Sequence, residues 1–337
     1  MANKGFKIGV DLGTANTLVY LNGQGVIFNE PSCVAFDRRN NKCIAVGQKA
    51  KDMIGREHQL IRIEKPLEGG VVADLDATKA LLEYVFERLA DINIEFSKTT
   101  LLLCCPSEVS QIEQVALMEL SEKLGVKDVF IEEEVKAGAI GAGIDIFAPR
   151  GSMIIDIGGG TTDIGVLALG DLVVSDSVRI AGRYFEEQII KYVKMKYSMA
   201  IGTRTAEAIK KTLGTVRREI INEKDYRFSG RNIVTGLPQR MVIRQSEIRN
   251  LMLRAFESIA IQSRKVLEKT PPELSSDIFE DGLVINGGGA LIDGVKEYFE
   301  EQLNLHCRIA ENPLTSIVGG TKYLLRNRGN YLVKPVD

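Results

Sequence analysis

The clearest pattern along the chain is a short apolar run that ends in a carboxylate and three glycines. Met153 to Ile155 predicts a buried strand, and the run from Asp156 to Asp163 (DIGGGTTD) follows before a second apolar run over 164–169. This pattern predicts a hairpin with a bare tip, where glycine amides can approach a phosphate closely and threonine hydroxyls add donors. Asp156 then suits a hydrated Mg²⁺, which favours one or two carboxylates with phosphate and water. A plain glycine-rich turn beside an acid explains the same pattern.

The same alternation of strand, acid and glycine occurs near the start of the chain. Phe6 to Val10 predicts a strand by alternation, Asp11-Leu-Gly-Thr-Ala-Asn-Thr follows, and 18–21 predicts the return strand. Asp11 matches Asp156 in this comparison, and Gly13 matches Gly158. A unit that recurs at half the chain length predicts a duplicated fold, with the two hairpins facing one ligand across a cleft.

Between the two hairpins, helical periodicity and capping signals predict a mixed α/β body. Asp76 is the predicted cap of a helix whose apolar face runs through Leu89, and Ser110-x-x-Glu113 predicts a capping box. A strand over 129–131 leads into three acids that end at Glu134. Such acids are usually a solvated helix start, yet ligands of parallel sheets bind at this strand edge, where an acid can orient water as a general base.

Two later stretches add to the candidate site. A third buried strand, 283–285, runs into Asn286-Gly-Gly-Gly-Ala and presents bare backbone, which beside two phosphate hairpins favours a nucleoside site. The helical stretch 205–211 puts Glu207, Lys210 and Lys211 on one face, where ordinary charge pairing is the simpler interpretation.

Composition restricts the class of protein without changing this picture. The chain has 337 residues, 45% hydrophobic and 26% charged, which is typical of a soluble protein long enough for two domains. A net charge of −2 gives no basic field for nucleic acid. Its five cysteines show neither zinc spacing nor a disulfide framework. A strand begins within a few residues of Met1, so we expect no signal peptide, and no apolar run reaches the roughly 20 residues of a membrane span.

Two segments raise the separate question of a membrane surface. The stretch 92–96 places Ile94 and Phe96 among polar residues, so it predicts either a loop tucked onto the body or a membrane-dipping tip. The C-terminal stretch 322–334 interleaves basic and apolar residues, which suits a solvated tail or a weak contact with anionic lipid.

These motifs together resemble the MreB family of bacterial actins, within the actin, Hsp70 and sugar-kinase ATPase superfamily. The resemblance covers essentially the whole chain, in the order Asp11-Leu-Gly-Thr-Ala-Asn-Thr, Asn29-Glu-Pro-Ser, Asp156 to Asp163, Gly202-x-x-Thr-Ala-Glu, Thr235-Gly-Leu-Pro, Thr270-Pro-Pro-Glu-Leu and Gly287-Gly-Gly-Ala-Leu. It implies an α/β, duplicated actin-like (ribonuclease H-like) fold of two domains around a nucleotide cleft. The implied division is 1–32, 66–145 and 315–337 as subdomain IA, 33–65 as IB, 146–181 and 246–314 as IIA, and 182–245 as IIB.

The resemblance also implies site residues, cofactors and partners. ATP or ADP and Mg²⁺ are the expected ligands, slow ATP hydrolysis the activity, and cell shape the role. The expected partners are further copies in paired antiparallel protofilaments, the inner membrane face and morphogenesis scaffold proteins, with a cytoplasmic, membrane-peripheral location. By motif position the implied site contains the metal-associated acids Asp11 and Asp156; the phosphate loops Gly13, Thr14, Ala15, Asn16 and Gly158, Gly159, Gly160, Thr161; the water-positioning acid Glu134 assisted by Thr161; the adenosine-side Glu207 and Lys210; the adenine-side Gly287, Gly288, Gly289 and Ala290; and the membrane loop residues Ile94 and Phe96.

One departure from the family pattern lies beside the implied catalytic acid. The family sequence Glu-Glu-Pro-x-Ala-Ala-Ala-Ile-Gly appears here with Val135 in place of proline and with Gly138 in the helix. Glycine weakens a helix by up to about 1 kcal/mol relative to alanine. The carboxylate is kept, so hydrolysis is expected. The alternatives are a small-molecule kinase of the same superfamily, for which no sugar-kinase signature is present, and a chaperone ATPase, for which no peptide-binding domain follows.

Overall fold

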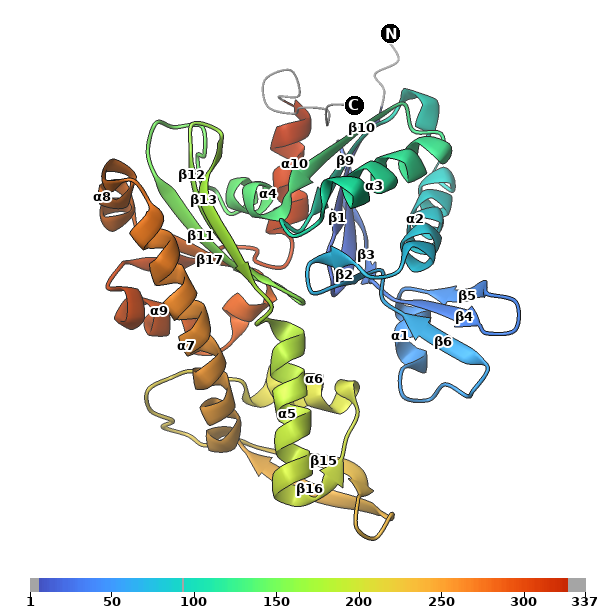
Figure 1. The fold of residues 1–337 in the computed structure, drawn as a ribbon, viewed down its shortest axis with the longest axis vertical. Helices are drawn as coiled ribbons and strands as arrows, with labels where there is room; N and C mark the ends of the chain where they lie inside the picture. Colours follow the sequence, from blue (N-terminus) through green and yellow to red (C-terminus); the bar gives the residue numbers. More distant parts are fainter. Residues whose placement is uncertain (1–5, 93, 327–337) are drawn as a thin grey trace. The chain divides into compact units, whose positions relative to one another are not determined.

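The computed structural model describes residues 6–92 and 94–326, which group into two units (Figure 1). Unit 1 contains the described residues of Met1–Arg150, Leu167–Val173 and Ala310–Asp337. Unit 2 contains Gly151–Val166 and Val174–Ile309. The chain therefore builds unit 1 from segments at both ends of the sequence.

Unit 1 is built on a five-stranded sheet in the order β10-β9-β1-β2-β3. Strand β1 pairs antiparallel with β2 and parallel with β9, which pairs parallel with β10. Side chains alternate along β1: Ile8 and Val10 join the core with α2, and Gly9 lies against Thr321 of α10. The elements of unit 1 are β1 (Lys7–Leu12), β2 (Asn16–Leu21), β3 (Gly25–Pro31), β4 (Val34–Asp37), β5 (Lys42–Val46), α1 (Gln48–Met53), β6 (Ile61–Glu64), β7 (Leu67–Glu68), β8 (Val71–Val72), α2 (Leu75–Ala90), the 3-10 turn η1 (Phe96–Lys98), β9 (Thr100–Cys105), α3 (Gln111–Lys123), β10 (Asp128–Glu133), α4 (Glu134–Gly141) and α10 (Ser316–Arg326).

Unit 2 is built on a second five-stranded sheet, in the order β13-β12-β11-β17-β18. Strand β11 pairs parallel with β17, and β17 pairs parallel with β18. Its core gathers the apolar faces of α5, α6, α7 and α9 around stacked Phe185 and Phe256. The elements are β11 (Ser152–Ile157), β12 (Thr162–Ala168), β13 (Asp171–Val178), α5 (Gly182–Tyr197), β14 (Met199–Ala200), α6 (Thr203–Leu213), β15 (Asp225–Asn232), β16 (Pro238–Arg244), α7 (Gln245–Lys269), α8 (Pro272–Asp281), β17 (Leu283–Asn286), the 3-10 turn η2 (Gly288–Leu291), α9 (Val295–Leu303) and β18 (Cys307–Ile309).

The two sheets repeat one arrangement. In each, three strands that follow one another closely in the chain occupy one side (β1-β2-β3 and β11-β12-β13), and two later strands add in parallel on the other side (β9-β10 and β17-β18). Strands β1 and β11 therefore hold equivalent central positions. These are the strands that the sequence pattern predicted as the first half of each phosphate hairpin.

Smaller sheets lie within the predicted inserted segments. Residues 33–65 contain the antiparallel sheet β5-β4-β6 and α1, with a small core around Ala35 and Ala50. Residues 182–245 contain the sheet β14-β15-β16 beside α5 and α6. The division into four subdomains stays a prediction.

Local capping signals had mixed outcomes. The capping box of α3 is confirmed, because Ser110 accepts from the Glu113 amide and Glu113 from the Ser110 amide. The cap assigned to Asp76 is wrong: α2 begins one residue before Asp76, and the carboxylate of Asp74 accepts from the Ala77 amide. Asp76 lies instead in the first turn, where the helix dipole favours an acid.

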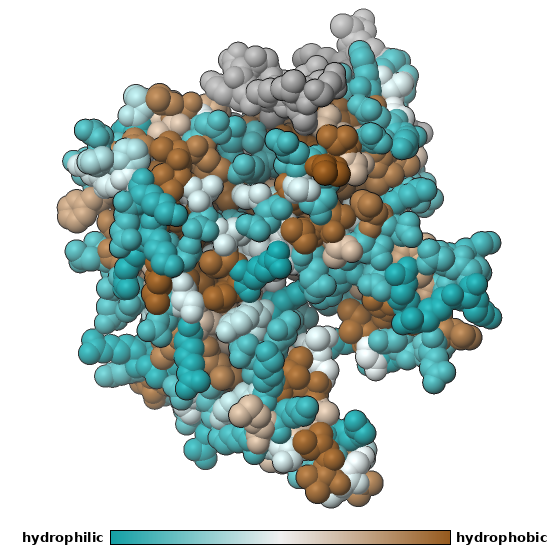
Figure 2. Space-filling view, in the orientation of Figure 1, coloured by the Kyte–Doolittle hydropathy of each residue, from teal (hydrophilic) through white to brown (hydrophobic). Residues whose placement is uncertain are grey.

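The end of the β15–β16 hairpin exposes apolar side chains in unit 2 (Figure 2). Val234 is 81% exposed and Leu237 is 65% exposed. The turn that carries them is well ordered, since the Asn232 carboxamide accepts from the amides of Val234 and Thr235. With Ile233, which is 45% exposed, these side chains give the hairpin an apolar tip on a hydrogen-bonded turn.

Helices α4 and α10 pack closely in unit 1 because glycine removes the side chains between them. A Cβ at Gly320 would lie 1.9 Å from the Ala137 carbonyl oxygen, and one at Gly141 would lie 1.7 Å from the Ser316 carbonyl oxygen. At Gly319, the neighbour of Gly320 in α10, an added Cβ would have nothing within 4 Å. The contact between the two helices fixes α4, and with it Glu134 at its first residue.

We predict that Gly320→Ala lowers the free energy of unfolding by about 1–3 kcal/mol, the usual cost of overpacking. Gly319→Ala in the same helix is the matched control, expected to stabilise by up to about 1 kcal/mol through helix propensity. Chemical denaturation of both variants measures the difference. Equal effects of the two substitutions would contradict the close packing of α4 and α10.

Candidate functional site

In unit 1, acidic side chains gather at the carboxyl end of three parallel strands. Asp11 on β1 lies in register with Cys104 on β9, which lies in register with Glu132 on β10. Glu134 follows as the first residue of α4. Ligands of parallel sheets bind at this edge, so the fold brings Asp11 and Glu134 to the place that the sequence predicted.

Two buried thiols, Cys104 and Cys105, lie beside these acids at the strand end. Burial raises the pKa of Cys104 well above its usual value, and the Asp11 carboxylate adds to the effect. Burial likewise raises the pKa of Cys105, with further contributions from Glu134 and Asp11. Both thiols therefore stay protonated at neutral pH, which makes them packing groups and not nucleophiles.

The first glycine loop is braced by Ser32, to which the sequence pattern assigned no separate role. Ser32 donates its hydroxyl to the Gly13 carbonyl at 2.6 Å, and its amide donates to the Ala15 carbonyl. The Asn16 carboxamide, at the far end of the loop, donates to the Asn29 side chain at 2.9 Å. The predicted loop residues Gly13, Thr14, Ala15 and Asn16 thus form one braced turn whose partners come from the Asn29-Glu-Pro-Ser motif.

The second glycine loop is held by the start of a helix in unit 2. The amides of Gly182 and Arg183, at the beginning of α5, donate to the carbonyls of Gly158 and Gly159. Because a carbonyl and the next amide point in opposite directions across a trans peptide, the amides of Gly159 and Gly160 point away from α5. The loop therefore offers amides in the manner of an anion-binding turn.

Thr161 closes this loop with both backbone and side chain. Its carbonyl accepts from the Gly158 amide at 2.9 Å, and its buried hydroxyl donates to Asp163 at 2.8 Å. The carboxylate of Asp163 thereby fixes the rotamer of the threonine. The DIGGGTTD pattern contained this acid, but only the structure gives it that role.

Asp156 lies at the end of β11, and its main partner comes from the neighbouring strand. Asn286, in register with Asp156 on β17, donates its carboxamide to that carboxylate at 2.7 Å. Gly287 has a φ of +78°, and a Cβ there would lie 2.4 Å from the Asp156 carboxylate. Gly289 lies as closely against Ile157. The predicted Gly287-Gly-Gly-Ala junction therefore meets the second loop at one strand end.

The residues predicted for the adenosine side lie on α6. Lys210 forms an ion pair with Glu186 of α5 at 2.6 Å and donates to the Gly182 carbonyl at 3.3 Å. Glu207 pairs with Lys211 at 2.8 Å on the exposed side of the helix. Lys210 is thus tied to the helix that holds the second loop, whereas the Glu207 contact is the ordinary charge pairing considered from sequence.

The donor set suits a magnesium ion held mainly by phosphate and water. Asp11 and Asp156 are both buried, and each is the penultimate residue of a strand that leads into a glycine loop. Within the described residues there is no cluster of three or more acids, histidines or cysteines able to enclose a metal. Mg²⁺ is commonly bound through one or two carboxylates plus phosphate oxygens, so the residues present fit that mode.

The predicted membrane residues are not exposed as a membrane-dipping tip requires. Ile94 is only 6% exposed and belongs to the core of unit 1, and Phe96 packs on Phe86 with ring centroids 5.0 Å apart. The tucked-loop interpretation holds for both, because the apolar side chains face the α2 core. The tail residues 327–334 lie outside the described residues. Along the described part of the chain, none of the helices combines the length and apolarity needed to cross a membrane.

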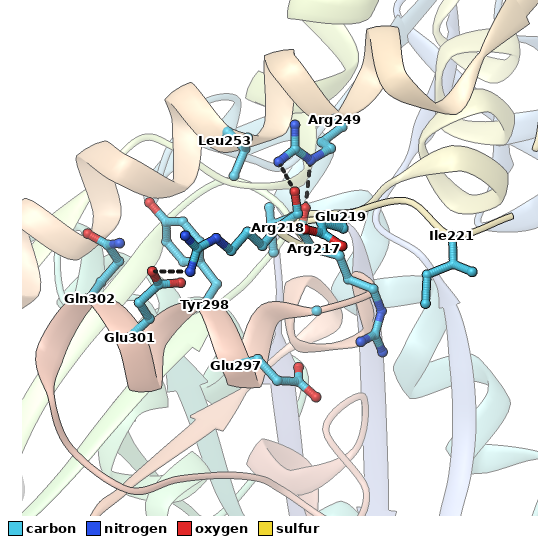
Figure 3. Close-up of a pocket in the computed structure, with 12 residues that line it drawn as sticks. Arg217, Arg218, Glu219, Ile221, Arg249, Leu253, Glu297, Tyr298, Glu301 and Gln302 are labelled. Carbon is cyan, nitrogen blue, oxygen red and sulfur yellow. Dashed lines mark hydrogen bonds and ion pairs between the residues drawn. The ribbon is translucent and has the colours of Figure 1, made fainter. Parts of the chain in front are cut away.

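A separate hollow in unit 2 contains none of the predicted nucleotide residues (Figure 3). It measures about 460 Å³ and lies between α7, α9 and the segment after α6. Arg249 donates to the carbonyls of Arg217 and Arg218, and Arg218 reaches Glu301 at 3.9 Å. These contacts hold the segment after α6 against α7 and α9. The arginines that line the hollow are therefore used in packing this segment.

Comparison with solved structures defines the class of protein. The chain resembles MreB5 of Spiroplasma citri bound to AMPPNP, with a TM-score of 0.92, 43% identity and coverage of 97% of this chain and 98% of that chain. It also shares its fold with the MamK double helical filament, at a TM-score of 0.79, 21% identity and coverage of 96% and 99%. The predicted duplicated actin-like fold is thereby confirmed.

The family is narrower than that class. The family model for the MreB/Mbl protein matches residues 5–332, and the chain belongs to this family. The cell shape-determining protein Mbl of Bacillus cereus is 45% identical over 320 residues, which cover 95% of this chain and 96% of Mbl. The predicted membership of the bacterial actins is therefore confirmed, and these relatives give no support to the kinase alternative.

Asp156 predicts a pH-dependent stability. Burial raises its pKa from 3.8 to about 7, with the Asn286 hydrogen bond opposing the shift. Since the folded pKa is the higher one, the folded protein binds the extra proton between these values, and its stability falls as pH rises through that window. The slope is at most about 1.4 kcal/mol per pH unit.

Asp156→Asn keeps an oxygen acceptor for Asn286 and removes the titration. We predict that the free energy of unfolding of the natural protein, without nucleotide or Mg²⁺, declines relative to that of the variant from pH 5 to pH 7. Urea denaturation across this range measures it. A difference between the two proteins that does not change with pH would refute the assignment.

Proposed function

We propose that the chain binds Mg²⁺ and ATP through both glycine loops, hydrolyses ATP slowly and assembles into filaments that maintain cell shape. The observation that carries the proposal is the repetition, in each unit, of a buried acid and a braced glycine loop at the end of a central parallel strand. Family membership supports it, as does the AMPPNP bound to the similar MreB5.

Each group has a proposed part in nucleotide binding. The loop amides around Gly13 and Gly159 bind phosphate oxygens, Asp11 and Asp156 hold Mg²⁺ through water, and bound Mg²⁺ supplies positive charge for the phosphoryl oxygens. Lys210 and Glu207 bind on the adenosine side. The glycines 287–289 and Ala290 leave room for the base.

Hydrolysis is proposed to depend on positioning. Glu134 orients a water for in-line attack on the terminal phosphate, and Thr161, fixed by Asp163, helps to hold it. Phosphate release then limits how long a filament persists. Slow ATP hydrolysis suits this role, because the rate of hydrolysis sets the filament lifetime.

Self-association is proposed to use the apolar tip of the β15–β16 hairpin. The strands behind the tip carry arginines at 227, 231, 240 and 244, and α8 of the same unit carries acids at 273, 277, 280 and 281 beside the exposed Phe279. Figure 1 shows these two elements at opposite ends of unit 2. A contact between the tip of one copy and α8 of the next is heterologous, and such contacts generate open filaments.

Further partners follow from the family expectation. We propose paired antiparallel protofilaments, peripheral association with the inner face of the cell membrane, and attachment of morphogenesis scaffold proteins. For the membrane, the basic C-terminal segment carries the proposal. Ile94 and Phe96 no longer contribute, because they are packed on the core.

We predict that Glu134→Ala retains ATP binding and loses phosphate release by at least about tenfold, because only the transition state needs the oriented water. Nucleotide titration and a phosphate-release assay measure the two properties. Glu122→Ala, an exposed acid on α3, is the control. Phosphate release that is unchanged in Glu134→Ala would remove this residue from the mechanism.

We predict that the double variant Val234→Ser/Leu237→Ser binds ATP normally and no longer sediments as polymer. Ile112→Ser is the matched control, since Ile112 is 83% exposed on α3 of the other unit. Sedimentation and electron microscopy with ATP report the result. Normal filaments from the double variant would exclude the hairpin tip as the self-association surface.

A further inference from the structure

Helix α4 contains a lysine where a buried helix normally has an apolar residue. Every residue from Val135 to Ile140 is buried, and Lys136 among them is only 7% exposed. A buried ammonium group is costly unless an anion compensates it. The question is therefore what this charge does in a helix that begins with Glu134.

The partner of Lys136 lies on the strand before the helix. Its ammonium nitrogen is 3.3 Å from the Glu132 carboxylate, and both side chains are about nine-tenths buried. Burial raises the pKa of Glu132, and the Lys136 charge opposes this shift. Because Glu132 lies near the end of β10 and Lys136 in the first turn of α4, the ion pair spans the junction in which Glu134 is the middle residue.

A second anion approaches the lysine from a different part of the chain. Asp171 lies 3.7 Å from the ammonium nitrogen but is 84% exposed, so water screens it. Asp171 belongs to the hairpin tip Leu167–Val173. Two hydrogen bonds hold this tip in unit 1: the Leu169 amide donates to the Ala148 carbonyl, and the Gly170 amide donates to the Ile146 carbonyl. Asp171 is therefore the weaker of the two partners.

The contact with α10 holds the body of α4, but local capping at the strand-to-helix junction is weak. The N-cap residue of α4, Glu133, makes no side-chain capping bond, whereas α3 begins with a complete capping box. Gly138 in the middle of α4 lowers its helical propensity. Stability alone does not explain the pair either, since buried ion pairs are often no more stabilising than apolar residues of similar size.

We propose that Lys136 is a positioning residue for ATP hydrolysis, which holds the β10–α4 junction through Glu132 and thereby sets the direction of the Glu134 carboxylate. The inference rests on the proposed function, and it adds a residue that the nucleotide itself does not touch. It also explains how the chain keeps this junction in place with Val135 and Gly138 beside the acid. A displacement of about 1 Å at a reacting group can cost up to about 10²-fold in rate.

The test uses the full chain, a phosphate-release assay for kcat and KM, titration of a fluorescent ATP analogue, and thermal unfolding. Lys136→Met alone leaves Glu132 buried without its cation, so folding can fail. The double variant Glu132→Gln/Lys136→Met restores neutrality and packing. We expect it to fold, with KM and nucleotide affinity within about twofold of the natural protein and kcat lowered at least about tenfold.

Asp171→Asn is the matched control, because it removes only the exposed anion, and its kcat is expected within about twofold of the natural protein. A double variant that folds and turns over ATP at the natural rate would overturn the positioning role while leaving the proposed function intact. A loss in KM alone would also overturn it. A natural protein that releases no phosphate from ATP would instead overturn the proposed function, and this inference with it.

Discussion

The part of the candidate site in unit 2 depends on the hydrogen bond between Asp156 and Asn286. Asp156 lies near the end of a strand that is buried along almost all of its length, and a carboxylate in that position needs a donor close by. Asn286 supplies it at 2.7 Å from the adjacent parallel strand. The chain after β17 passes so close to Asp156 that Gly287 must be glycine, and the turn proposed for the base therefore lies beside the loop proposed for phosphate.

Unit 1 repeats the strand arrangement of unit 2 but carries different side chains at the end of its central strands. Cys104 takes the register position beside Asp11 that Asn286 takes beside Asp156. The added acids come instead from β10 and α4, where Glu134 is placed by the Glu132–Lys136 pair and by close contact with α10. The duplication thus keeps the loop and strand geometry in both halves. The acid proposed to orient water follows β10 in unit 1, and the residues proposed for the adenosine side lie on α6 of unit 2.

How much the sequence predicts depends on how local each feature is. Neighbouring residues determine the two glycine hairpins, their acids and the capping box of α3. The sequence pattern therefore predicts these features. The Asp156–Asn286 bond joins residues 130 positions apart, and nothing local indicates it. The sequence did not determine whether Ile94 lies on the surface or in the core, because its loop has no clear hydrophobic period. Packing against α2 places it in the core. No sequence pattern singles out Lys136, since periodicity cannot show that its helix is buried on all sides.

The proposal that both glycine loops bind one nucleotide is tested most directly by the stoichiometry of ATP binding. Calorimetric titration of the natural protein should give one ATP per chain. Gly13→Ala and Gly158→Ala, one in each unit, would place a methyl group 2.8 Å and 3.1 Å from loop carbonyl oxygens. Each should weaken that single site on its own. Two ATP molecules per chain, or a variant that loses half of the sites and keeps the rest at full affinity, would contradict the account.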